Sequence, residues 1–138
     1  MNSYNSKTGA GSIGVEFAGT VVTSPSAFGA GIAPAAANNI SRQLVAINSD
    51  LQWSEASFRG FFTLTIDSET LNATYYAMNN ISESSFCVWF RAVDCLVTVG
   101  FANLDGFASA NFAVRNEENE LSRPAAGGVV KAGILKDV

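Results

Sequence analysis

The sequence contains no histidine, and it has only two cysteines and three prolines in 138 residues. The lack of histidine excludes a Ser-His nucleophile, because Ser24 and Ser122 have no imidazole to act as their base. The two cysteines are not spaced Cys-x-x-Cys, so they lack the partners that a zinc site requires. We therefore expect none of these common catalytic or metal-binding sets in this chain.

Charged residues are also scarce. They make up 14% of the chain, only eight are lysine or arginine, and the net charge is −4. The basic residues are scattered and form no stripe that could neutralise a nucleic-acid backbone. The apolar stretch of residues 86–101 is interrupted by Arg91 and Asp94 and is shorter than the roughly 20 apolar residues of a membrane span. We expect neither nucleic-acid binding nor a membrane span, and the sparse charge predicts a surface prone to association.

Asn39, Asn72 and Asn80 each begin an Asn-x-Ser/Thr sequon, the acceptor for N-glycosylation. Such sequons also arise by chance in a chain rich in serine and asparagine. The polar residues 1–7 lack the apolar stretch of a secretory signal, so a signal either lies upstream or does not exist. The sequons favour a parent protein that is a secreted or extracellular glycoprotein.

Local patterns predict a strand-rich chain with one main helix. Residues 12–22 are β-branched and punctuated by glycine, which predicts a strand with Ile13 and Phe17 on its buried face. Beyond Pro34, apolar residues recur at three- and four-residue intervals, which predicts a helix over residues 35–48. The predicted buried face of this helix consists of Ile40, Leu44, Ile47 and Leu51.

A hairpin and a further strand are expected after the helix. Residues 60–66 and 71–78 are rich in β-branched and aromatic side chains and flank a turn-forming stretch. Residues 107–114 alternate between apolar and polar, which predicts a strand buried on one side, with Ser109 turned away from the core. With no repeat and no second domain, residues 1–138 are expected to form a single α+β, strand-rich unit.

Three segments of the sequence, taken in order, are similar to segments of a known protein family. They are SIGVEFAGTVVTSP over residues 12–25, NSDLQW with FRGFFTLTI and LNATYY over residues 48–76, and NLDGFASA with LSRP over residues 103–124. Together they resemble the C-terminal portion of PhoD-like alkaline phosphatases, a family of metallophosphatases, and the last is similar to fungal members. The resemblance covers most of residues 12–124, in the order of the family.

The resemblance implies hydrolysis of phosphate mono- and diesters by a catalytic domain built as an α/β/β/α sandwich. Metal ions, expected to be iron and calcium, polarise the phosphate in such enzymes. Their ligands lie mainly upstream of the matched region, so no residue here inherits a metal-ligand role and no cofactor is expected in this chain. By this resemblance, residues 1–138 are one incomplete domain that supplies C-terminal strands and a covering helix and is inactive alone.

Residues 85–100 depart from the family pattern, in which few residues separate the flanking segments. This apolar block carries Cys87 and Cys95, which could form a hairpin disulfide in an oxidising compartment or remain two buried thiols. We interpret the block as an insertion, either a translated intron or a genuine extra hairpin packed on the sheet. Sequencing the transcript decides between these, because a spliced message without these codons would remove both cysteines.

The main candidates for a substrate site surround an aromatic residue. Trp53 and Arg59 could shape the mouth of a substrate site, because an arginine between aromatic residues suits phosphate or sugar binding. Asp50 and Glu55 could complete this rim. Packing of the same side chains without any ligand is the alternative.

Other polar residues are weaker candidates. Glu16 and Asp105 could be site carboxylates, but an isolated acidic residue in a strand is more often solvent-facing or paired. The glycine-rich residues 9–14 resemble a phosphate-binding loop only superficially. They precede a predicted strand, so the helix N-terminus that would bind a phosphate is missing.

Two functions of different classes fit these observations. In the first, the chain is the C-terminal part of a secreted PhoD-like phosphatase, with the N-terminal part of that enzyme as its partner and phosphate esters as its substrates. In the second, it is a stand-alone, non-catalytic, β-rich secreted module that self-associates or binds a polymer through exposed aromatic residues and unpaired sheet edges. The resemblance implies a Gly-Asp-x-His stretch just before the matched region. In-frame codons for that stretch upstream of the chain would favour the first function, and a stop codon and promoter there would favour the second.

Overall fold

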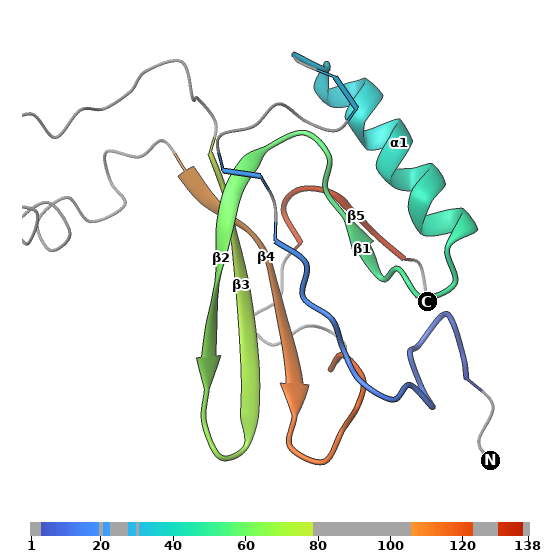
Figure 1. Ribbon diagram of the computed structural model, residues 1–138, viewed down its shortest axis with the longest axis vertical. Coiled ribbons are helices and arrows are strands. Elements are labelled where there is room, and N and C mark those ends of the chain that lie inside the picture. Colours follow the sequence, from blue (N-terminus) through green and yellow to red (C-terminus); the bar gives the residue numbers. More distant parts are fainter. Residues whose placement is uncertain are drawn as a thin grey trace, which may run out of the picture.

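The computed structural model of the chain describes residues 4–19, 21–22, 28–29, 31–78, 106–122 and 130–136. Within these residues, β1 and β5 form a two-stranded antiparallel sheet, and β2, β3 and β4 form a three-stranded antiparallel sheet in that order (Figure 1). The strand-rich α+β class predicted from the sequence is confirmed. The elements are α1 (Pro34–Ile47), β1 (Trp53–Ser54), β2 (Arg59–Ile66), β3 (Thr70–Met78), β4 (Gly106–Arg115) and β5 (Ile134–Leu135).

The helix α1 packs against the small β1–β5 sheet (Figure 1). It begins at Pro34, whose fixed φ and missing N–H suit the first helical turn. Both ends lie one residue from the predicted ones. Ser54 Oγ in β1 donates a hydrogen bond to Ser41 Oγ in the helix at 3.3 Å. In the described residues, no helix has the length and apolar character needed to cross a membrane.

The buried face of α1 differs from the predicted one. Ala37, Ser41 and Val45 are buried, whereas Ile47, which was expected to face the core, is 80% exposed. Ile40 and Leu44 are half-buried, as expected in part, and Leu51 lies beyond the end of the helix. The prediction was therefore wrong for Ile47 and for the centre of the buried face. Ala37 and Ser41 are fully buried, and their small side chains allow the helix to lie close to β1 and β5, which bulky residues at the contact would prevent.

Strands β2 and β3 form the predicted hairpin, with every residue of β2 paired to β3. The turn is closed by Asp67, whose Oδ1 accepts N–H bonds from Glu69 and Thr70 at 2.8 and 2.7 Å. These bonds lower the pKa of Asp67, because they stabilise the ionised carboxylate. At the other end of β2, a Cβ on Gly60 would lie 1.9 Å from the carbonyl oxygen of Tyr76. Only glycine allows the two strands to approach this closely.

The core lies on the face of the sheet shared by β3 and β4. Ala73, Tyr75, Ala110 and Phe112 form its buried cluster, and the alternation over residues 107–114 predicted the burial of the two in β4. Ser109 was expected to turn away from the core, but it is buried. The register shifts next to Tyr75, and Ser109 Oγ donates to the Tyr75 carbonyl at 3.2 Å. A β-bulge therefore redirects this side chain.

The strand predicted over residues 12–22 is absent, because the described residues of this segment belong to neither sheet. The segment instead crosses the face of the three-stranded sheet (Figure 1). Phe17 packs against the core cluster, and the Ala18 carbonyl accepts a hydrogen bond from Tyr75 Oη at 3.1 Å. Ile13, expected on the buried face, is 99% exposed. A segment that lies across a sheet cannot join its ladder, because ladder hydrogen bonds run within the plane of the sheet.

The small sheet joins segments that are distant in sequence. Trp53 and Ser54 pair with β5, and Trp53 Nε1 donates a hydrogen bond to the Ala132 carbonyl at 3.1 Å. Gly133 has a φ of +81°, and a Cβ there would lie 2.6 Å from the Ser54 carbonyl oxygen. The Lys131 N–H donates to the Ser109 carbonyl at 2.7 Å. The C-terminal segment is thereby tied to both sheets.

Candidate functional site

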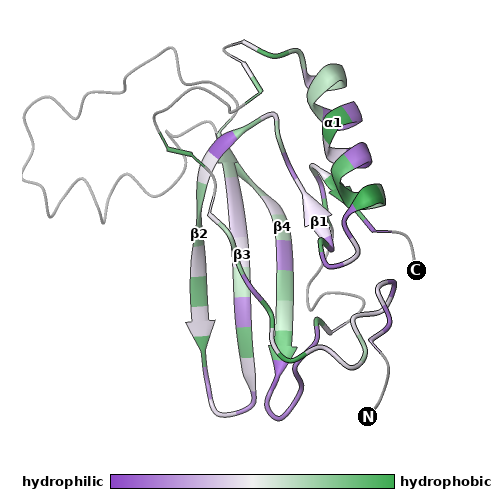
Figure 2. Cartoon of the chain, turned by 45° about the vertical axis from the view of Figure 1, so that its right-hand side comes forward, coloured by the Kyte–Doolittle hydropathy of each residue, from purple (hydrophilic) through white to green (hydrophobic). Residues whose placement is uncertain are grey.

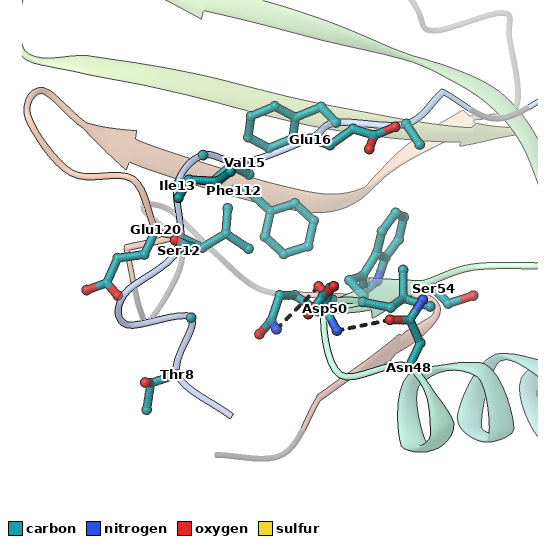
Figure 3. A pocket seen from close by; sticks show the side chains of 18 of the residues that line it. Thr8, Ser12, Ile13, Val15, Glu16, Asn48, Asp50, Ser54, Phe112 and Glu120 are labelled. Atoms are coloured by element: carbon teal, nitrogen blue, oxygen red, sulfur yellow. Dashed lines mark hydrogen bonds between the residues drawn. The ribbon is translucent and has the colours of Figure 1, made fainter. Parts of the chain in front are cut away.

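An open cavity of about 850 Å³ lies between the N-terminal segment, the connection from α1 to β1, and the core face of β3 and β4. We call this cavity the hollow (Figure 3). Its walls are the extended residues 11–19 on one side and residues 50–55 on the other. The hollow exists because residues 11–19 lie over the core face of the sheet, and the segment reaches the β2 edge at Val21, whose carbonyl accepts a hydrogen bond from Gly60 N–H.

Aromatic side chains form the floor of the hollow. The ring of Trp53 lies 4.9 Å from that of Tyr75 and 5.5 Å from that of Phe112, measured between centroids. Tyr75 and Phe112 are almost completely buried. Burial also raises the pKa of Tyr75 to about 12, because the ionised phenolate would lose its hydration. The floor is therefore largely apolar, and it is uncharged over the usual pH range.

The rim of the hollow is acidic. Glu16, Asp50, Glu55 and Glu120 line it, and no lysine or arginine is among its described lining residues. The carboxylate of Glu55 accepts N–H bonds from the backbone of its own loop, at Ser57 and Phe58. Burial raises the pKa of Glu55, and these hydrogen bonds oppose the shift. A negative rim disfavours a bare phosphate ester in the hollow.

The loop after α1 is held by a small network. Asp50 N–H donates to Asn48 Oδ1 at 3.0 Å, and Ser49 Oγ donates to Asp50 Oδ1 at 2.9 Å. Lys136 Nζ donates to the carbonyls of Asn48 and Ser49 at 2.7 and 2.8 Å. Burial, followed by the nearby charge of Asp50, raises the pKa of Tyr4. The C-terminal segment thus fixes one side of the rim.

The rim carboxylates do not converge. Figure 3 shows Glu16, Asp50 and Glu120 on different sides of the hollow. Over the described ranges, no three His, Cys, Asp or Glu side chains lie where they could hold a metal ion together. The residues of the hollow therefore do not fit the iron and calcium ions that the resemblance implies, and we derive no chemical step through a metal here.

The structure brings together only part of the rim expected from the sequence. Trp53, Asp50 and Glu55 line the hollow, but Arg59, at the start of β2, is not among the lining residues. Tyr75 and Phe112 were not singled out as site residues, although strand alternation could have placed both on the core face. Glu120 carried no recognisable signal, because only the tertiary structure brings it beside residues 11–19.

Other candidates lie away from the hollow or outside the described residues. Asn39 is exposed on α1, but Ser41 of its sequon is fully buried. Asn72 lies in the central strand β3, where its amide donates to Thr70 Oγ1 at 3.0 Å. Ser122 Oγ is buried and has no hydrogen-bond partner among the described residues. The candidates outside the described residues are Ser24, Asn80, Asp105, the pair Cys87 and Cys95, and the insertion at residues 85–100.

Comparison of the chain with protein-family models, with curated proteins and with solved structures finds no match.

Proposed function

We propose that the chain is the C-terminal portion of a PhoD-like phosphatase, in which it supplies strands, a covering helix and one wall of the mouth of the active site. In this proposal, hydrolysis of phosphate mono- and diesters belongs to the complete secreted enzyme. Its metal ligands lie in the upstream part of the α/β/β/α sandwich. The chain alone is inactive.

One observation carries this proposal. The three segments on which the family resemblance rests are far apart in sequence, yet residues of all three line the same hollow. Glu16 comes from the first segment, Trp53 and Tyr75 from the second, and Leu121 from the third. An arrangement in which family-like segments surround one cavity favours a shared role at a site over three unrelated likenesses.

The charge of the hollow fits a supporting role. The rim carries four carboxylates, and the described lining residues hold no cation to balance them. A phosphate ester would be repelled there unless positive charge came from elsewhere. In the proposed enzyme, that charge belongs to the part of the protein that carries the metal ligands.

The test compares two polypeptides in the hydrolysis of p-nitrophenyl phosphate and bis-p-nitrophenyl phosphate, each with and without added iron and calcium. One is the 138-residue chain, and the other extends it upstream through the whole catalytic domain, so that it carries the metal ligands. We expect hydrolysis only from the longer polypeptide. Hydrolysis by the chain alone, or by neither polypeptide, would overturn the proposal.

A charge variant tests whether the hollow faces the substrate in the longer polypeptide. Glu16→Gln removes a rim charge, so we expect KM for the monoester to fall while kcat changes little. Glu118→Gln is the matched control, because Glu118 is exposed in a turn and does not line the hollow. Equal KM values for the two variants would show that the hollow is not part of the active-site mouth.

A further inference from the structure

Within the described residues, strand β2 lies at the edge of the three-stranded sheet, where it pairs with β3 on one side (Figure 1). The C-terminal half of the strand is exposed, including two apolar side chains on the core face of the sheet. Leu64 is 47% exposed and Ile66 is 68% exposed. The described side chains that pack on the core face of β3 and β4 therefore leave the C-terminal half of β2 exposed.

The hydrogen bonds around β2 show which backbone groups face outward. In the turn, Asp67 N–H donates to the Thr70 carbonyl, so the odd-numbered residues of β2 bond to β3. The even-numbered residues then point away from the sheet, and Gly60 N–H accordingly donates to the Val21 carbonyl at 3.2 Å. Beyond Gly60, the outward groups of Phe62, Leu64 and Ile66 have no hydrogen-bond partner in the described part of the chain.

This edge lacks the features that keep sheet edges apart. Residues 60–66 contain no charged residue and no proline, whereas exposed edges are commonly protected by a lysine, a proline or a bulge. Figure 2 shows that strongly hydrophilic residues flank this stretch of β2 but are absent from it. Arg59 lies at the start of the strand, and the acidic residues Asp67 and Glu69 lie in the turn beyond its other end.

We propose that β2 pairs with β2 of a second copy of this chain, antiparallel and across a twofold axis at Leu64, so that two sheets join into one of six strands. The three outward-facing residues define this register. Leu64 lies opposite its own counterpart, and Phe62 lies opposite Ile66 of the second copy. Val21 keeps its hydrogen bond to Gly60, because that position lies outside the paired stretch.

Charge complementarity supports the antiparallel orientation. In this register, the basic end of β2 in each copy, at Arg59, lies toward the acidic turn of the other, which carries Asp67 and Glu69. A parallel arrangement would instead place like charges together at both ends. Pairing also moves two apolar side chains of each copy out of water. It depends only on the β2 edge and stands whether or not the chain belongs to a phosphatase.

The first experiment measures the mass of the purified chain in solution by sedimentation equilibrium over a range of concentrations. We expect a reversible dimer whose dissociation constant rises at least about tenfold in Leu64→Lys, because this variant places two lysines at the twofold axis and removes buried apolar area. Ile47→Lys is the matched control, since Ile47 is also exposed and apolar but lies on α1. A monomeric chain, or equal weakening by both variants, would overturn the inference.

A second experiment tests the register and does not rely on a destabilising change. With Cys87 and Cys95 replaced by serine, Leu64→Cys should form a cross-linked dimer on mild oxidation, because paired strands bring its Cα within disulfide range of its counterpart. Ile66→Cys should not, since its counterpart would lie roughly 13 Å away along the strands. Circular dichroism confirms that both variants fold. Equal cross-linking of both, or cross-linking of Ile66→Cys alone, would exclude this register.

Discussion

Replacing Tyr75 with phenylalanine tests how the N-terminal segment is held across the sheet. The ring of Tyr75 is 4% exposed and contacts Trp53 and Phe62 at 4.9 and 5.1 Å between centroids, and phenylalanine preserves these contacts. The change removes only the hydrogen bond from Oη to the Ala18 carbonyl. Because Ala18 is exposed, its carbonyl can bond to water in the variant, and we expect a loss of about 1 kcal/mol in the free energy of unfolding at neutral pH.

The same variant should behave differently at alkaline pH. The pKa of Tyr75 is raised from 10.0 to about 12 by burial, so folding favours the neutral phenol. The stability that this preference contributes is complete below pH 10 and is lost as pH rises through 12. Phenylalanine cannot ionise. Between these pH values, Tyr75→Phe should lose less stability than the unmodified chain, and the difference between the two proteins should shrink.

Urea denaturation at pH 7 and at intervals between pH 9 and 12 measures both effects. Hydrogen exchange then locates the change, which we expect in residues 13–19 and not in the three-stranded sheet. Tyr4→Phe serves as the control, because Tyr4 is 42% exposed and its hydroxyl donates to an exposed carbonyl at 3.3 Å. The reasoning would be refuted if Tyr75→Phe were as stable as the unmodified chain at neutral pH and lost as much stability as that chain between pH 10 and 12.

Two further predictions concern the β2–β3 hairpin. Gly60→Ala should destabilise the fold by roughly 1–3 kcal/mol, because its Cβ meets the Tyr76 carbonyl; Gly14→Ala, with no atom within 4 Å of the added Cβ, is the control, and equal urea midpoints would contradict the strand geometry. Asp67→Ala should loosen the turn at neutral pH. We expect the backbone amides of Glu69 and Thr70 to lose their protection from hydrogen exchange first. Because the pKa of Asp67 is lowered from 3.8, the stability from its hydrogen bonds is present above pH 3.8 and disappears as pH falls through the lowered pKa. If the free energy of unfolding fell equally at acid pH in the variant and in the unmodified chain, this carboxylate would not hold the turn.

Patterns local in the sequence determined the main elements. The three- and four-residue spacing of apolar residues after Pro34 predicted α1 to within one residue at each end, and the turn-forming residues around Asp67 predicted the hairpin. Strand alternation predicted that Phe112 and Ala110 would be buried in β4. These predictions succeed because helix and hairpin contacts join residues that are near neighbours in the chain.

Tertiary contacts decided the remainder. Nothing local distinguishes a β-branched segment that joins a sheet from one that crosses it, so residues 12–22 were predicted as a strand, and the hollow could not be foreseen. The buried face of α1 is set by the contact of the small residues Ala37 and Ser41 with β1 and β5. This contact is not local, because β5 lies about 80 residues further along the chain than β1. The rim likewise joins Glu16, Asp50 and Glu120 through packing alone. The sequence by itself determined α1, the β2–β3 hairpin, β4 and the acidic, histidine-free composition. The placement of the carboxylates around one aromatic floor arose only from long-range packing.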